Sequence, residues 1–138
     1  MDLKRRHILL VDDDAGHAYL TQRNLQRFSL DMDIEWVGSG SEALSTLEEA
    51  QSKNQLPDLI LLDLNMPGLS GFDVLENLDK DEQLKAIPRF IISTSDEPDD
   101  MKKSEHFGYV EYVIKPIDYP VLIDQIKQLF KETVEQEA

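Results

Sequence analysis

Side chains suited to phosphoryl chemistry follow short apolar stretches at four separate places in this chain. They are Asp12 and Asp13 after Ile8–Val11, Asp63 after Leu59–Leu62, Ser93 after Phe90–Ile92, and Lys115 after Tyr112–Ile114. A carboxylate can act as a nucleophile, while a cation and a hydroxyl can stabilise the oxygens of a transferred phosphoryl group. This chemistry requires a fold that brings the four places together.

The central stretch, Leu59 to Gly71, is an apolar run that ends at Asp63 and continues into a turn with Pro67 and Gly68. Unbroken apolar runs bounded by turn residues are typical of strands buried on both faces of a parallel sheet. Asp63 would then lie at the carboxyl end of a central strand, where open α/β sheets bind their ligands. An acid there could equally be a helix cap or a turn residue. The residues that follow the other strands therefore have to distinguish these roles for Asp63.

Five apolar stretches alternate with five helical patterns. The expected strands are His7–Val11, Asp33–Val37, Leu59–Asp63, Phe90–Ile92 and Tyr109–Ile114. The expected helices are Ala15–Phe28, one capped by Ser39 or Ser41 and carrying Ala43 to Ala50, one from Phe72 to Leu78, Asp96–Phe107 and Val121–Val134. This alternation predicts an α/β, doubly wound parallel sheet, with Asp33–Val37 at an edge. Because all carboxyl ends of a parallel sheet lie at one edge, the reactive side chains should meet there.

Three neighbouring carboxylates would repel one another, which normally raises a pKa or recruits a cation. Oxygen ligands that coordinate a cation incompletely suit Mg2+, which keeps several waters and shares its shell with phosphate. Lys115 could pair with Asp63 or with a phosphoryl oxygen, and Ser93 supplies a hydroxyl donor. The interpretation is an acyl phosphate formed on Asp63.

The composition narrows the class of protein. The 138 residues fit one domain, expected to span 1–138 without an output domain, and the net charge of -14 argues against sequence-independent nucleic acid binding. There is no cysteine. No apolar run is long enough to span a membrane, and the run after Lys4–Arg6 is broken at Asp12, too early for a signal peptide. We therefore expect a cytoplasmic protein with no membrane partner.

The four motifs together resemble those of receiver domains of two-component response regulators. They are Val11-Asp12-Asp13, Leu62-Asp63-Leu64-Asn65-Met66-Pro67, Ser93-Thr94 and Tyr112-Val113-Ile114-Lys115-Pro116. The resemblance covers essentially the whole chain and implies a stand-alone CheY-like receiver with a flavodoxin-like (βα)5 fold, strand order 2-1-3-4-5. The segment Ser93–Asp96 and the connection Gln51–Gln55 resemble the group that includes cyanobacterial phytochrome response regulators.

The resemblance implies a phosphorylation-dependent signalling switch with Asp63 as the phosphoacceptor. Asp13 would bind Mg2+ directly and Asp12 largely through water. Asp63 and the backbone carbonyl of Asn65 would complete the protein's share of the metal shell. The phosphodonor would be a sensor histidine kinase or a histidine phosphotransfer protein.

The resemblance also assigns the residues that respond to phosphorylation. Ser93 would be the switch hydroxyl, Tyr112 the aromatic residue that turns inward behind it, and Lys115, before a usually cis Pro116, would hold a phosphoryl oxygen. An aromatic residue in a strand is also commonly half-buried core, so Tyr112 keeps both interpretations. The face formed by Asp96–Val134 would then bind a partner or a second copy of the chain.

Several alternatives remain open. A Mg-dependent aspartyl phosphatase or phosphotransferase would typically need a second acid two residues after the nucleophile, where this chain has Asn65. An adaptor independent of phosphorylation would not need the intact set of acids, hydroxyl and lysine. Among neighbouring residues, Asp14 is predicted to cap the first helix, His17 to lie on its surface, and Trp36 to be a packing residue.

Overall fold

In a computed structural model of the chain, the structure is described for residues 5–28, 32–94 and 98–137. Within this part of the chain, five strands form one parallel sheet in the order β2-β1-β3-β4-β5. The strands are β1 (Arg6–Val11), β2 (Met32–Val37), β3 (Leu59–Asp63), β4 (Arg89–Ser93) and β5 (Glu111–Ile114). The predicted doubly wound, flavodoxin-like fold and its strand order are confirmed, as is the edge position of β2.

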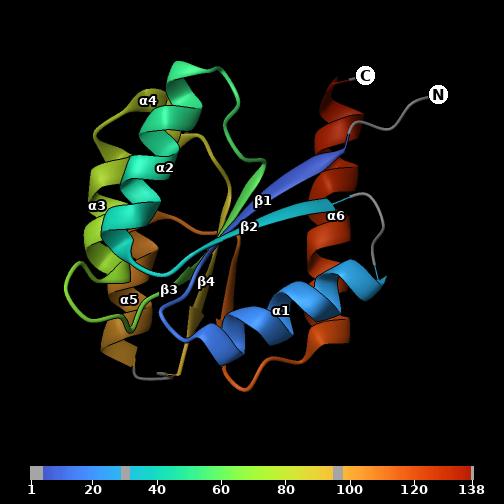
Figure 1. Cartoon of the computed structure of the whole chain (residues 1–138), viewed down its shortest axis with the longest axis horizontal. Helices are drawn as coiled ribbons and strands as arrows, with labels where there is room; N and C mark the ends of the chain where they lie inside the picture. The colour runs from blue at the N-terminus through green and yellow to red at the C-terminus, as the bar shows by residue number, and fades with distance from the viewer. Residues whose placement is uncertain (1–4, 29–31, 95–97, 138) are drawn as a thin grey trace.

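Helices cover both faces of the sheet (Figure 1). One face carries α1 (Ala15–Phe28) and α6 (Tyr119–Glu137); the other carries α2 (Gly40–Ser52), α3 (Gly71–Asp79), α4 (Glu82–Lys85) and α5 (Pro98–Phe107). Alternate residues of β1 enter separate hydrophobic clusters, because successive side chains of a strand point to opposite faces. Leu9 joins the cluster under α2 and α3, and Leu10 the cluster under α1 and α6.

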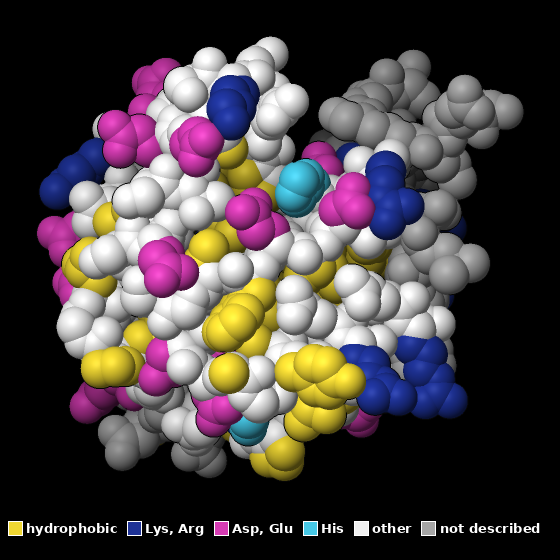
Figure 2. All heavy atoms as spheres, viewed as in Figure 1, with side chains coloured by type: hydrophobic (Ala, Val, Ile, Leu, Met, Phe, Trp, Pro, Cys, Tyr) yellow, Lys and Arg dark blue, Asp and Glu magenta, His cyan; other side chains and the backbone are white. Residues whose placement is uncertain are grey.

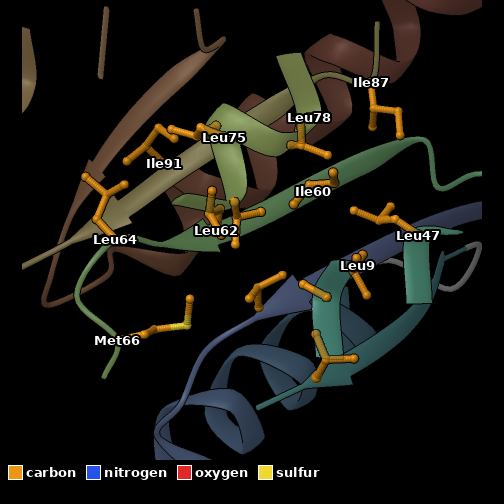
Figure 3. Close-up of a cluster of buried hydrophobic side chains, with 14 residues drawn as sticks. Leu9, Leu47, Ile60, Leu62, Leu64, Met66, Leu75, Leu78, Ile87 and Ile91 are labelled. Atoms are coloured by element: carbon orange, nitrogen blue, oxygen red, sulfur yellow. The ribbon is translucent and has the colours of Figure 1, made fainter. Parts of the chain in front are cut away.

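The central strand β3 is buried along its whole length. Figure 3 shows one side of it, where Ile60 and Leu62 belong to the same cluster as Leu47 of α2 and Leu75 of α3. Each such side chain contributes about 1.5 to 3 kcal/mol of burial free energy relative to an exposed one. This packing on both faces holds the strand, and therefore Asp63 at its end, in a fixed position.

The structure differs from the prediction by one additional helix and by several element boundaries. The structure has six helices among its described residues, because the Asp81 side chain accepts hydrogen bonds from the amides of Gln83 and Leu84 and starts the one-turn helix α4. The prediction of five helices was wrong here, because the apolar pattern fades after α3 and does not indicate another helix. Strand β5 begins at Glu111 instead of Tyr109, after a turn in which Gly108 has φ +77.

The last helix is longer than predicted, spanning Tyr119–Glu137 instead of Val121–Val134. Its earlier start follows from Asp118, whose side chain accepts the Val121 amide and whose carbonyl accepts the Leu122 amide. The start of the preceding helix can be compared only from Pro98, because Asp96 and Glu97 lie outside the described residues. Ser39 caps α2, as one of the two predicted caps.

Candidate functional site

The carboxyl ends of β1, β3, β4 and the end of β5 meet at one edge of the sheet. The Lys115 ammonium lies 3.3 Å from a carboxylate oxygen of Asp63 and 3.4 Å from one of Asp12. Carboxylate oxygens of Asp12, Asp13 and Asp63 all lie within 4.8 Å of one another. Residues more than one hundred positions apart in the sequence thus share one site, where they can act on a single ligand.

The strand register explains this convergence. Val11 pairs with Leu62, which places Asp12 beside Asp63, and Asp63 itself pairs with Ile92. On the far side, Ser93 pairs with Ile114, and the Lys115 amide donates to the Ser93 carbonyl over 2.8 Å. The Lys115–Pro116 peptide bond is cis. Asp63 and Ser93 are thus the last residues of their strands, Asp12 and Lys115 follow their strands directly, and Asp13 lies one position further.

Asp63 and Lys115 are both buried, and burial affects their charges differently. Removal from water raises the pKa of Asp63 to about 6, and the nearby Asp12 carboxylate adds to this rise. The Asn65 amide and Lys115 oppose it without cancelling it. Burial pushes the pKa of Lys115 down, but the charges of Asp63 and Asp12 outweigh burial and raise it. The ammonium thus stays protonated, while Asp63 titrates at a pKa of about 6.

The donor set fits a hard divalent cation. It consists of carboxylate oxygens, with Asp12 and Asp63 only 3% and 4% exposed and Asp13 open to solvent. A site of this kind provides part of a coordination shell and leaves room for water and phosphate, as Mg2+ requires. One lysine does not neutralise three acids, so a cation would relieve their repulsion. The backbone carbonyl of Asn65 stays a predicted ligand.

The Asn65 side chain binds both hydroxyl groups that follow the β4 core. Its Nδ2 donates to Oγ of Ser93 and to Oγ1 of Thr94, each over 3.0 Å, while its backbone amide donates to an Asp63 carboxylate oxygen. The sequence placed Asn65 at the site but predicted neither of these side-chain contacts. Asn65 thereby connects the acid of β3 to the hydroxyl groups at the end of β4.

Tyr112 lies on β5, half-buried against the cluster that includes Ile91. Its ring meets that of Tyr109 edge to face, with centroids 5.7 Å apart. This position is compatible with packing and with a switch, so the predicted switch role stays a prediction.

Two residues near the acids take different roles. Asp14 accepts the His17 amide over 3.1 Å, so it caps α1 as predicted, and His17 lies in the first turn of that helix. Trp36 was expected only to pack, yet its indole Nε1 donates to the Asp12 backbone carbonyl over 2.8 Å. No periodicity in the sequence signals a contact between these two residues.

The visible surface in Figure 2 carries scattered acidic side chains with hydrophobic groups between them. This matches a chain with 28 acidic and 14 basic residues. Across the helices that the structure describes, none has both the length and the apolar character needed to span a membrane.

Comparison with known proteins gives consistent matches. Residues 8–127 match the family model of the response regulator receiver domain. The probable methanogenesis regulatory protein FilR2 of Methanothrix harundinacea is 34% identical over 125 residues, covering 88% of this chain and 81% of FilR2. The phosphorylated cyanobacterial phytochrome response regulator RcpA is 31% identical, with a TM-score of 0.77 and 91% of each chain covered. The Mn(2+)-bound form of response regulator Rcp1 is 31% identical, with a TM-score of 0.73, covering 90% of this chain and 88% of Rcp1.

Proposed function

Since this chain belongs to the family of response regulator receiver domains, we propose that it works as a phosphorylation-dependent signalling switch with Asp63 as its phosphoacceptor. The observation that carries this assignment is the position of the Asp63 carboxylate. It is buried at the end of β3, 3.3 Å from the Lys115 ammonium and grouped with the acids of Asp12 and Asp13. Among the acids described at this edge, Asp63 is the one that both contacts the Lys115 ammonium and ends a strand paired with β4, which ends at Ser93.

In the proposed reaction, a carboxylate oxygen of Asp63 attacks the phosphorus of a phosphohistidine. A P–O bond to Asp63 forms while the P–N bond to the donor imidazole breaks, and the imidazole leaves with the bonding electron pair and takes up a proton. Because the pKa of Asp63 is about 6, this side chain is ionised, and so nucleophilic, in most molecules at neutral pH. Lys115 is placed to neutralise a phosphoryl oxygen.

We assign the cation site to Asp12, Asp13, Asp63 and the backbone carbonyl of Asn65, with Mg2+ as the ion. When bound, the ion supplies positive charge that stabilises the phosphoryl oxygens. The protein's part is to hold the carboxylates in place. The Asp12 carboxylate is buried beside Lys115, and the Asp13 carboxylate lies on the solvent side.

Phosphorylation would be read out through Ser93 and Tyr112. In the structure the Ser93 hydroxyl accepts a hydrogen bond from Asn65, and a movement of this hydroxyl toward a phosphoryl oxygen would alter that contact. The proposed readout face, Asp96–Val134, includes exposed apolar side chains at Val110, Ile114 and Val121. Local chemistry at Asp63 would then bias the packing of this face, where a partner or a second copy binds.

Receiver domains in general receive phosphoryl groups from histidine kinases or phosphotransfer proteins, and we propose such a donor for this chain. It would act in the cytoplasm and without a nucleic acid partner. The chain would catalyse only its own phosphorylation and dephosphorylation. Turnover as an aspartyl phosphatase is disfavoured, because Asn65 occupies the position of the second acid and its amide is engaged with Ser93 and Thr94.

Intact-protein mass spectrometry after incubation with acetyl phosphate and Mg2+ tests the proposal. The wild type should gain one phosphoryl group that hydroxylamine removes, as an acyl phosphate requires. Asp63→Asn should gain none, while the exposed control Asp124→Asn should behave as the wild type. A phosphoryl group on Asp63→Asn would place the acceptor elsewhere.

A further inference from the structure

Trp36 is the only tryptophan of the chain, and it lies on β2, the edge strand drawn in cyan in Figure 1. Its side chain is 39% exposed, so it is neither a core residue nor a freely projecting one. Hydrophobic side chains are visible among the acidic ones on the face that Figure 2 shows from the same direction. A half-exposed indole on an edge strand needs a reason for its position.

The indole is held in this position by a hydrogen bond to the backbone of Asp12. The Asp12 amide donates to the Val37 carbonyl over 3.2 Å, and the Asp12 carbonyl accepts the Trp36 indole N–H over 2.8 Å. Both polar backbone groups of this acidic residue are therefore held by the last two residues of β2. The contact joins positions 24 residues apart.

The end of the ladder explains why a side chain makes this bond. The β1–β2 pairing stops at Val11 and Val37. In a continuing parallel ladder, the Asp12 carbonyl would accept the amide two residues beyond Val37. That residue, Ser39, is instead the N-cap of α2. The indole N–H thus replaces the donor that the strand loses when it ends.

We infer that Trp36 is a positioning residue for the Asp12–Asp13 acid pair, and that its indole N–H tunes the affinity of this site for a divalent cation. The hydrogen bond fixes the peptide plane that joins the two acids, and so the directions in which both carboxylates leave the backbone. Hydrogen bonds to the ligating groups themselves commonly change metal affinity by about 10-fold or more, and a bond to the backbone between two ligands should act less strongly. The inference rests on the proposed function, because it assumes that these acids bind a cation.

A purely structural role for Trp36 is the competing interpretation. The ring lies near the turn after β2, since a Cβ added at Gly38 would lie 3.8 Å from ring atom Cζ2. Loss of this packing would lower the free energy of unfolding without a specific effect on cation binding. Metal affinity in the folded protein therefore separates the two roles.

The experiment measures Mn2+ binding to the full chain, without a phosphodonor, from the electron paramagnetic resonance signal of the free ion. Trp36→Phe, which keeps a ring and removes the N–H donor, should weaken Mn2+ binding by about 3- to 10-fold. Leu20→Ala, which removes a side chain that is 50% exposed on α1, should leave it within about twofold of the wild type. An affinity of Trp36→Phe within about twofold of the wild type overturns the inference.

A second variant guards against a folding defect. Replacing Trp36 by 3-benzothienylalanine exchanges the indole N–H for sulfur and keeps the shape of the ring. If Trp36→Phe fails to fold, weaker Mn2+ binding by this variant supports the inference and unchanged binding overturns it. Failure of the wild type itself to bind Mn2+ or Mg2+ is a different result: it rejects the proposed cation site, and the inference with it.

Discussion

Asp63→Asn should stabilise the metal-free protein at neutral pH, although it removes the proposed phosphoacceptor. The pKa of Asp63 is raised from 3.8 to about 6 because the carboxyl group is buried beside Asp12. Between these values the folded protein holds a proton that the unfolded chain has released, so the free energy of unfolding falls as pH rises through this window. Above the window, the folded state carries a buried charge that asparagine would not have.

The size of the effect follows from the shift. One pKa unit corresponds to about 1.4 kcal/mol, so the Asp63 charge costs at most about 3 kcal/mol near pH 7.5 and about half of that near pH 5. Two factors reduce the gain from Asp63→Asn. Lys115 loses one of its two carboxylate partners, and solvent near the exposed Asp13 screens part of the charge. We expect the variant to be about 1 to 2 kcal/mol more stable than the wild type near pH 7.5.

Urea unfolding of the wild type, Asp63→Asn and the exposed control Asp124→Asn, in the presence of EDTA near pH 7.5 and pH 5, measures this difference. The advantage of Asp63→Asn should shrink by about 1 kcal/mol at the lower pH, because wild-type Asp63 is then mostly protonated. The control should lie close to the wild type at both pH values. A variant that is less stable than the wild type, or an advantage independent of pH, would refute the electrostatic account of Asp63.

Three further changes test other parts of the molecule. Mg2+ at one hundred times its Kd should stabilise the folded wild type by about 2.7 kcal/mol and so raise its melting temperature. An unchanged melting curve would contradict the cation site. Thr94→Ala should shorten the lifetime of the phosphoryl group, measured by its decay in mass spectra, because a smaller side chain opens the path to water; an unchanged half-life would refute this role. Arg89→Met should lower the free energy of unfolding by about 1 to 3 kcal/mol, because the buried guanidinium donates to the Lys85 and Ile87 carbonyls that would lose their donor. Urea unfolding checks this against the exposed control Lys85→Met, and equal stability of the two variants would count against it.

The sequence predicts the sheet and the convergence of the site because both follow from one rule. Parallel strands read as apolar runs, and their carboxyl ends share an edge, so residues after those runs must meet. The helix α4 escaped prediction because a single turn is too short for a hydrophobic period and depends on the cap at Asp81. The contacts of Asn65 with Ser93, and of Trp36 with Asp12, escaped for another reason. Each of these contacts joins a side chain to a group that is distant in the sequence, and no local sequence pattern determines which rotamer makes such a bond.

The ion pair between Lys115 and Asp12 joins residues 103 positions apart, so the site is complete only after the whole sheet has been synthesised. During synthesis the amino-terminal acids leave the ribosome long before the lysine does. An incomplete chain therefore displays Asp63 without the cation that should receive a phosphoryl oxygen. If Asp63 is the phosphoacceptor as proposed, phosphorylation would depend on the docking of β5, because only then does Lys115 lie beside Asp63.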